Sequence, residues 1–380
     1  MRYFFVVGEA SGDLHASRLM KALKTEDPEA SFAFVGGPNM RELGGKVVHR
    51  SEDLSIMGFI PVIKNLRYLS ETGRKVQEAM LDYGPDVIVC VDFSGFCYRY
   101  ILPFAHDNLP LAKVVYYIPP KVWAWKKWRV RQLRELTDLV LCIFPFEIPF
   151  FKKEGVSKAL YVGNPTFESV EEYLSVPRER TYSGEYVALL CGSRPGEVLS
   201  NLPTMIDVLR ETGAKGVLAA APSVSDSFIR EVLKPEDFDI IEVVHGDTYG
   251  VVRDAKAALV TSGTATLETA LLGTPQVVCY SVKGGRVANF LFDNFFSVDY
   301  ISLVNLIASA EVAPEMFGGL FKTRLISKAL IPLLSETPER QSMLSGYQSV
   351  RDSLKSSGTS ASHAAAAAIL ALSKQAQRPD

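Results

Sequence analysis

Short runs of β-branched and aromatic residues alternate along the chain with longer segments whose apolar residues recur at helical spacing. In the first part these runs are "YFFVV" (3–7), "SFAFVGG" (31–37), "DVIVCVD" (86–92), "KVVYYI" (113–118), "DLVLCIF" (138–144) and "ALYVGNP" (159–165). A second series follows, with "YVALLCGS" (186–193), "GVLAAAP" (216–222), "DIIEVV" (239–244), "AALVTSGT" (257–264) and "PQVVCYS" (275–281). Strands that alternate with helices are typical of parallel βαβ units. The pattern predicts an α/β protein of two tandem Rossmann-like domains with a cleft between them.

The apolar runs give way to Pro, Ser, Glu and Arg over residues 163–185, which is typical of a domain boundary. We therefore expect domains at 1–165 and 166–356. Beyond about residue 311 the spacing turns helical, and the alanine-rich stretch 357–376 has strong intrinsic helix propensity. In open α/β folds ligands bind at the carboxyl ends of the strands, so candidate chemistry is sought just after each run.

Composition places the chain among globular proteins. Of its 380 residues 47% are hydrophobic and 22% charged, and the formal net charge of −2 gives no indication of nucleic-acid binding. Five dispersed cysteines without a CxxC pair predict reduced thiols and a cytoplasmic location. The first residues are too short an apolar run for a signal peptide, and the longest apolar stretch is interrupted by Pro145, Glu147 and Pro149, so we expect no membrane-spanning helix.

Asp92 ends the run "PDVIVCVDFSGF", in which six apolar residues separate two acids as in a strand buried on both faces. One interpretation makes it a turn residue or the cap of the following helix. The other makes it a general base, a carboxylate between a cavity wall and a substrate.

Two turns in the second half could hold a diphosphate. In "LLCGSRPGEV" the residues Gly192, Ser193 and Arg194 precede a helix, and a guanidinium beside a helix N-terminus offers donors and positive potential. In "SGTATLETALLGTP" small residues precede a helix with a carboxylate one turn later, suited to a pyrophosphate and to ribose hydroxyls; these residues are Ser262, Gly263, Thr264 and Glu268. Ordinary helix capping would use the same residue types in both turns.

Metal chemistry has little support in the sequence. The turn "EDFD" carries Asp237 and Asp239 at the spacing of a metal-dependent glycosyltransferase, but a charged surface turn is ordinary at that place. The histidines are dispersed, and neither GxSxG nor GxxxxGK[ST] is found. We expect no metal and no cofactor.

Two stretches combine apolar and cationic residues. In "IMGFIPVIKNLRYLSETGRKVQEAM" (56–80) the later residues fit a core-facing helix, whereas the earlier part could contact lipid through Met57, Phe59, Ile60, Lys64 and Arg67. In "KVWAWKKWRVRQLRE" (121–135) three tryptophans, among them Trp123 and Trp125, accompany six cations, which suits phosphate-bearing headgroups. Nucleic acid could use the same groups, although this patch stands alone in a balanced chain.

The glycine-rich turn "GEASGD" (8–13) follows the first predicted strand. Gly8 and Gly12 lie four apart with no following Lys-Ser/Thr, so the turn fits neither a P-loop nor the GxGxxG fingerprint. We expect a helix from about Leu14, capped by Ser11 and Asp13, at the same sheet edge as Asp92.

With these motifs in order, the sequence resembles the lipid-A-disaccharide synthase family of inverting glycosyltransferases. The resemblance runs nearly end to end and rests on "GEASGD", "MGFIPV", "PDVIVCVDF", "VWAW", "TDLVLCIFPFE", "GSRPGEV", "SGTATLE" and "DYISLVNLIA". It implies a GT-B fold whose final helix, 357–376, returns to the first domain. It also implies UDP-2,3-diacylglucosamine as donor, 2,3-diacylglucosamine 1-phosphate as acceptor, and a β-1′,6-linked disaccharide with UDP as products.

By the same resemblance the N-terminal domain binds the acyl-sugars and meets the membrane, and the C-terminal domain binds UDP. Asp92 corresponds to the catalytic base, Glu9 and Ser11 to the active-site loop, and Arg194, Glu268 and Asn305 to the UDP side. The expected protein is cytoplasmic, associated peripherally with the inner face of the inner membrane, and able to form a homodimer.

The chain departs from the family at two places. It has "PPKVWAW" where relatives commonly have "SPSVWAW", so Lys121 lies near a substrate wall and could alter contacts to the acceptor phosphate. After Asp92 it has "FSGF" where others have "APDF", so Gly95 removes a nearby carboxylate. Two alternatives are open. One is another UDP-sugar enzyme of the same architecture, such as a lipid-linked N-acetylglucosaminyltransferase or a UDP-sugar 2-epimerase. The other is a non-catalytic nucleotide- or lipid-binding module.

Overall fold

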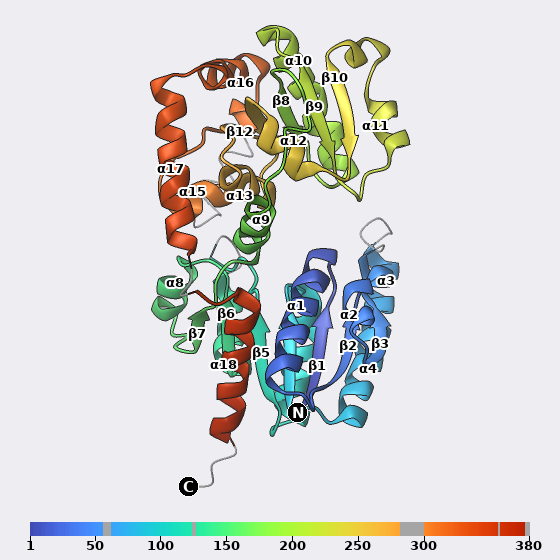
Figure 1. Ribbon diagram of the computed structural model, residues 1–380. Helices are drawn as coiled ribbons and strands as arrows, with labels where there is room; N and C mark the ends of the chain where they lie inside the picture. Colours follow the sequence, from blue (N-terminus) through green and yellow to red (C-terminus); the bar gives the residue numbers. More distant parts are fainter. Residues whose placement is uncertain (56–61, 124–126, 282–299, 356–357, 377–380) are drawn as a thin grey trace. The chain divides into compact units, whose positions relative to one another are not determined.

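The computed structural model describes residues 1–380 except 56–61, 124–126, 282–299, 356–357 and 377–380 (Figure 1). Its contacts divide the chain into two compact units. Unit 1 comprises Met1–Pro165 with Lys355–Asp380, and unit 2 comprises Thr166–Leu354. Each unit is described by itself.

Unit 1 is built on a seven-stranded sheet in the order β3-β2-β1-β4-β5-β6-β7, and every neighbouring pair is parallel. The strands are β1 (Arg2–Val7), β2 (Ser31–Gly36), β3 (Lys46–Arg50), β4 (Val87–Val91), β5 (Lys113–Tyr117), β6 (Leu139–Cys142) and β7 (Ala159–Tyr161). Residues 87–91 of β4 are all buried, as expected of a central strand covered on both faces.

Helices connect these strands. They are α1 (Ala10–Glu26), α2 (Pro38–Glu42), α3 (Ser51–Ser55), α4 (Val62–Tyr83), α5 (Ser94–Phe96), the π-helix η2 (Cys97–Ile101), α6 (Leu102–Asn108), the 3-10 turn η3 (Lys127–Arg129), α7 (Val130–Leu136), α8 (Glu147–Lys153) and α18 (Ala361–Ala376). Helix α18, red in Figure 1, packs against α1, β5 and β6, so the last described part of the chain completes the first unit. Its buried face consists of Ala361, Ala365, Ala366 and Ile369.

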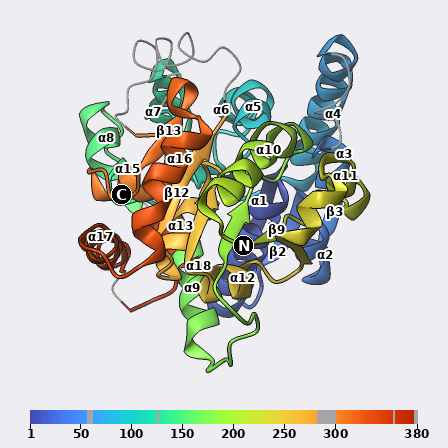
Figure 2. The same ribbon diagram turned by 90° about the horizontal axis from the view of Figure 1, so that it is seen from above.

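Unit 2 is built on a six-stranded parallel sheet in the order β10-β9-β8-β11-β12-β13. Its strands are β8 (Val187–Leu190), β9 (Gly216–Ala220), β10 (Ile241–His245), β11 (Ala257–Val260), β12 (Gln276–Tyr280) and β13 (Glu315–Phe317). Its helices are α9 (Pro165–Ser175), α10 (Pro195–Thr212), α11 (Asp226–Val232), η4 (Pro235–Asp239), α12 (Thr248–Asp254), α13 (Thr264–Leu271), α15 (Leu303–Ala308), η5 (Gly318–Leu320), α16 (Thr323–Leu330), η6 (Ile331–Leu334) and α17 (Pro338–Leu354). Helix α16 lies against α10 and covers β12 (Figure 2).

The sequence prediction of two parallel α/β sheets is confirmed, and each of the eleven quoted runs overlaps a strand. Two edge strands were missed. β3 begins and ends with a cation and has a register shift against β2, and β13 has only three residues within a region expected to be helical. Both segments become strands because they pair with a neighbouring strand. Segments this short or this charged have no hydrophobic alternation from which such pairing could be predicted.

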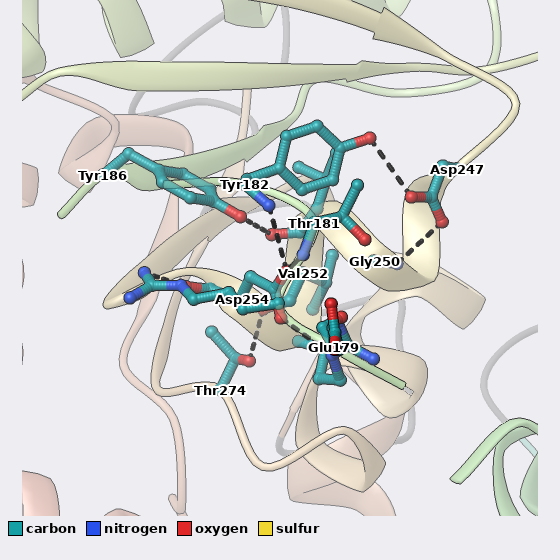
Figure 3. Close-up of polar contacts among 12 residues, drawn as sticks. Glu179, Thr181, Tyr182, Tyr186, Asp247, Gly250, Val252, Asp254 and Thr274 are labelled. Atoms are coloured by element: carbon teal, nitrogen blue, oxygen red, sulfur yellow. Dashed lines mark hydrogen bonds and ion pairs between the residues drawn. The ribbon is translucent and has the colours of Figure 1, made fainter. Parts of the chain in front are cut away.

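The segment expected to join two domains is anchored to unit 2 at its carboxyl end (Figure 3). Asp254 accepts hydrogen bonds from the backbone N–H groups of Thr181, at 2.7 Å, and Tyr182, at 3.2 Å. The Tyr182 hydroxyl donates to Asp247 at 3.1 Å, and Asp247 also accepts from the Gly250 N–H of the first turn of α12 at 3.0 Å. Residues 181–182 are therefore held by the two ends of α12.

Candidate functional site

The carboxyl edge of the unit 1 sheet brings several predicted residues together. The register aligns Val7 with Val91, Val91 with Tyr117, and Tyr117 with Leu141, so β1, β4, β5 and β6 end at about the same level. The turns that follow them carry Glu9, Asp92, Lys121 and Glu147. We call these four residues the charge row.

Asp92 is exposed at this edge and has a left-handed backbone, with φ of 40°. Its N–H points back to the Tyr117 carbonyl at 3.4 Å. At the end of the next strand Ile118 has φ of 59°, although a β-branched residue strongly disfavours that region. Strained backbone of this kind persists only where packing fixes it and is enriched at active sites, which favours the functional interpretation of Asp92 over that of an ordinary turn.

The surroundings of Asp92 set its proton affinity. Partial withdrawal from water raises the pKa of Asp92 to about 6, the positive charge of Lys121 opposes the rise, and the negative charge of Glu9 adds to it. A carboxyl with a pKa near 6 is ionised at pH 7 and is a better proton acceptor than an ordinary aspartate. The arrangement suits a general base.

The "GEASGD" turn lies beside Asp92. Helix α1 begins at Ala10, four residues earlier than expected, and the side chains of Glu9 and Ser11 are exposed. A Cβ on Gly8 would lie 2.3 Å from the ring of Phe93, which directly follows Asp92, so the two turns are packed together. Only a glycine fits this contact.

Asp13 has a different role from the one expected. It lies inside α1, is 1% exposed, and caps α2 instead of its own helix. Its carboxylate accepts from the N–H groups of Gly37 at 2.8 Å, Asn39 at 2.9 Å and Met40 at 3.3 Å, and from the Asn39 side chain at 2.8 Å. The prediction that it caps its own helix is therefore wrong, because four donors from three residues beyond β2 hold the carboxylate.

Trp123 and Glu147 form a buried pair that the sequence did not predict. Glu147 is 1% exposed and accepts from the Trp123 indole N–H at 3.2 Å and from the N–H groups of Ile143, at 3.2 Å, and Phe144, at 3.1 Å. Burial raises the pKa of Glu147 to about 7, against the effect of these donors and of Lys121. The signal available was an acid directly after the apolar run "LCIFPF".

The lipid-contact residues predicted from sequence are only partly described. Trp123 is 5% exposed, so its indole contacts protein, and the expected membrane contact at this side chain is wrong. Arg67 is exposed and pairs with Glu71 at 3.0 Å on α4, and Lys64 lies on the same helix. The remaining members, Met57, Phe59, Ile60 and Trp125, lie outside the described residues. Trp128, by contrast, is 70% exposed and has the Arg129 guanidinium 5.4 Å from its ring centre.

In unit 2 the turn after β8 presents an accessible guanidinium. Gly192 has φ of 116°, and the Ser193 N–H donates to Glu197 at 3.0 Å. Arg194 precedes α10, its side chain is 76% exposed, and among the described residues it forms an ion pair with Glu197 at 3.2 Å. A guanidinium this exposed can meet an anion in addition to Glu197.

The turn after β11 starts α13 at Thr264. Gly263 has φ of 150°, Thr264 is exposed, and the Ser262 hydroxyl donates to the Ile301 carbonyl at 2.9 Å. Glu268 accepts from the Tyr249 hydroxyl at 3.0 Å; burial raises its pKa, and this hydrogen bond opposes the rise. The helix start and one carboxylate are thus placed as the sequence predicted.

Asn305 does not have the role expected on the UDP side. It is fully buried, and its side-chain oxygen accepts from the N–H groups of Val312, at 2.8 Å, and Ala313, at 2.9 Å. Its amide donates to the Ala313 carbonyl at 2.8 Å and to Glu315 at 2.9 Å. With these four bonds formed, a direct contact with UDP would require one of them to break, so we withdraw Asn305 as a ligand contact.

Asn201 was missed although it organises the same edge. It is buried on α10 and donates to the Cys191 carbonyl at 3.2 Å and to the Thr261 hydroxyl at 3.0 Å. Its oxygen accepts from the Ser281 N–H at 2.9 Å. One side chain thus joins the ends of β8, β11 and β12.

The acidic turn at 236–239 has a structural explanation. Asp237 is 2% exposed, accepts from the Lys234 N–H at 2.7 Å, and pairs with Arg210. In the described part of the chain no group of three His, Cys, Asp or Glu residues could hold a metal ion, and no helix is long and apolar enough to cross a membrane.

This chain is similar to known proteins along nearly its whole length. Residues 3–369 match the family model described as lipid-A-disaccharide synthetase. A relative from Syntrophus aciditrophicus named lipid-A-disaccharide synthase is 33% identical and covers 97% of this chain and 96% of its own. Another with the same name, from Solibacter usitatus, is 33% identical over 91% of both chains.

Solved structures show the same fold at low identity. The calicheamicin glycosyltransferase CalG4 is similar with a TM-score of 0.61 and 13% identity over 99% of both chains. The UDP-GlcNAc 2-epimerase from Neisseria meningitidis, solved with UDP-GlcNAc, gives 0.59 and 11%, covering 99% of this chain and 100% of its own. These likenesses confirm the GT-B fold class.

Proposed function

The chain belongs to the lipid-A-disaccharide synthase family and is a glycosyltransferase that forms the lipid A disaccharide, and we propose that Asp92 is its general base. The family implies a nucleotide-sugar donor and a lipid acceptor. The observation that supports the role of Asp92 is its left-handed position at the end of a buried strand, combined with a pKa near 6. The other UDP-sugar enzymes and the binding module considered above are not favoured by the family.

In this mechanism Asp92 takes the proton of the acceptor 6-hydroxyl as that oxygen attacks the anomeric carbon of the donor. The new bond forms on the face opposite the UDP group, the bond to the UDP oxygen breaks, and configuration inverts in one displacement. We propose UDP-2,3-diacylglucosamine as donor and 2,3-diacylglucosamine 1-phosphate as acceptor. Glu9 and Ser11 are then polar groups beside the attacking sugar.

The leaving UDP acquires negative charge that unit 2 can stabilise. The exposed Arg194 guanidinium and the N–H groups at the start of α13 are suitable donors to a diphosphate, and Glu268 can accept from ribose hydroxyls. Gly192, Ser193, Ser262, Gly263 and Thr264 shape these two turns.

A lipid acceptor also requires access to a membrane. We propose peripheral association with the inner face of the inner membrane through the exposed Trp128 and its neighbouring cations, Arg129 and Arg131. Homodimer formation stays a prediction.

Substitution of Asp92 by Asn tests the assignment. We expect disaccharide formation to fall by at least about a hundredfold, the usual scale of general-base catalysis, while UDP binding measured by calorimetry is unchanged. The assay is UDP release that depends on both acyl-sugar substrates. The matched control is Asp82→Asn, at an exposed position of α4. Near-wild-type turnover of Asp92→Asn would refute the role.

A further inference from the structure

A cavity of about 370 Å³ lies at the amino edge of the unit 2 sheet, and all of its lining residues belong to unit 2. This volume is within the range of small-molecule sites. The lining includes two acids, Glu185 and Asp254, and five cations, so it has an excess of three positive charges. The five cations are Arg178, Arg180, Arg253, Lys256 and Arg340, and we call this cavity the basic pocket.

The basic pocket is separate from the turns proposed to bind UDP. Glu185 and Lys256 lie just before β8 and β11, whereas those turns follow the same two strands. Each strand has four residues, so about 13 Å of extended chain separates the two edges of the sheet. The mechanism proposed above makes no use of the basic pocket.

Two arginines of the pocket are anchored by the backbone around them. The Arg180 Nη2 donates to the carbonyls of Gly184, at 2.6 Å, and Asp254, at 2.8 Å. The Arg253 Nη2 donates to the Glu179 carbonyl at 2.9 Å, and its Nε donates to the Asp254 carboxylate at 2.7 Å; both acceptor residues are labelled in Figure 3. Within the described chain the Nη1 groups of these two arginines form no hydrogen bond. Each guanidinium is therefore positioned and still has N–H donors for a ligand.

Arg340 reaches the pocket from α17, and its side chain is only 14% exposed. Its Nη1 donates to the carbonyls of Lys256 and Leu333, both at 2.7 Å. Its Nε is shielded from water and lies 3.3 Å from a Glu336 carboxylate oxygen, without hydrogen-bond geometry. Carbonyl groups have no net charge, so these anchors hold the guanidinium without neutralising it. With Glu336 counted, the excess is still two positive charges.

The acids of the lining do not neutralise the other cations. Each of the two is already paired with one cation, at 2.7 and 2.9 Å. Neither Arg178 nor Arg180 forms an ion pair with a described residue, and Arg178 lies 4.6 Å from the centre of the Tyr173 ring. Cations that line one cavity repel one another, and an anion between them turns this repulsion into attraction.

We propose that the basic pocket binds a phosphate-bearing anion, either a soluble phosphate or the phosphate of a lipid headgroup. Four of its five cations are arginines, whose paired N–H donors match phosphate oxygens. An excess of two or three positive charges suits a phosphate monoester or a diphosphate. Because Arg178 and Arg180 precede β8 and Arg253 ends α12, a bound anion would fasten residues 178–185 to that helix.

Hydrogen exchange of the full-length protein, titrated with pyrophosphate at constant ionic strength, tests this. We expect slower exchange in peptides spanning 178–186 and 252–258, which are distinct from peptides of the proposed UDP turns. Arg178→Gln removes an exposed cation for which no hydrogen bond is described, and should raise the half-saturating concentration about fivefold, the effect of one unit charge about 4 Å from another in water. Glu185→Gln should lower it. The control is Arg324→Gln, at an exposed position of α16, which should leave it unchanged.

A second titration with lipid vesicles distinguishes the two sources of phosphate. Protection by pyrophosphate shows that a soluble phosphate is sufficient, whereas protection only by phosphatidylglycerol vesicles, and not by phosphatidylcholine vesicles, identifies an anionic headgroup. Unchanged exchange of both peptides with every ligand would overturn the proposal. So would equal protection by sodium chloride, or a half-saturating concentration that Arg178→Gln leaves unmoved. The measurement involves no turnover, so its outcome is independent of the role of Asp92.

Discussion

The cap that Asp13 provides to α2 should contribute strongly to the stability of unit 1. Its carboxylate holds four hydrogen bonds, and two of them, from the N–H groups of Gly37 and Met40, are buried. Replacement by Ala leaves both donors without an acceptor. Each such group costs about 1–3 kcal/mol, so we expect a loss of about 4 kcal/mol.

Tryptophan fluorescence reports this loss selectively. All three tryptophans of the chain, at positions 123, 125 and 128, belong to unit 1. With a urea m-value of about 2 kcal/mol per molar, the expected loss lowers the fluorescence midpoint by about 2 M at an unchanged slope.

A matched substitution in unit 2 is the control. Asp247 also caps a helix, α12, and additionally accepts from Tyr182. Asp247→Ala should leave the tryptophan transition where it is. If Asp13→Ala moved the midpoint by less than about 0.3 M, water would have to hydrogen-bond to the N–H groups of α2 in place of the carboxylate. The stabilising role assigned to this cap would then be wrong.

Two further changes test the buried polar groups. Asn305→Ala removes the acceptor of the Val312 and Ala313 N–H groups, so we expect about thirtyfold faster hydrogen exchange in a peptide spanning 310–317, from a loss of about 2 kcal/mol. Unchanged exchange with weaker UDP binding would return Asn305 to the ligand site. For Glu147, burial raises the pKa to about 7, so its contribution to the free energy of unfolding is fully present below pH 4.5 and is lost as pH rises through about 7. The free energy of unfolding lost in this way is up to about 3 kcal/mol. The fluorescence midpoint should therefore fall from pH 5 to pH 8 by less in Glu147→Gln than in wild type; an equal fall would contradict this.

The sequence predicted those parts of the fold in which local pattern and tertiary structure agree. A run such as "VIVCV" has nothing but apolar residues, because β4 is covered on both faces, and it marks both the strand and the position of Asp92 at its end. The edge strand β13 shows the opposite case. Its three residues, beginning with Glu315, are too few to show an alternation of hydrophobic and polar positions, and they form a strand because they pair with β12.

The sequence could predict which residues lie at the sheet edges, because that depends only on their position directly after a strand. Residues directly after buried strands, such as Asp92 and Arg194, lie at sheet edges for topological reasons. The partners of buried polar groups could not be predicted. Asp13 caps a helix 25 residues further along, and Asn305 bonds to a loop seven residues away, so a polar residue buried in a helix was the only available signal.

The place of α18 in unit 1 has a consequence for biosynthesis. Residues 355–380 belong with 1–165, so the whole of unit 2 is inserted between two parts of one folding unit. During translation the ribosome releases the sheet of unit 1 first, then all of unit 2, and only then the helix that packs on α1, β5 and β6. Vectorial synthesis favours early folding of the leading domain. Here unit 1 is completed only after unit 2 has been synthesised, and the faces that α18 covers stay exposed until residues 361–376 have emerged.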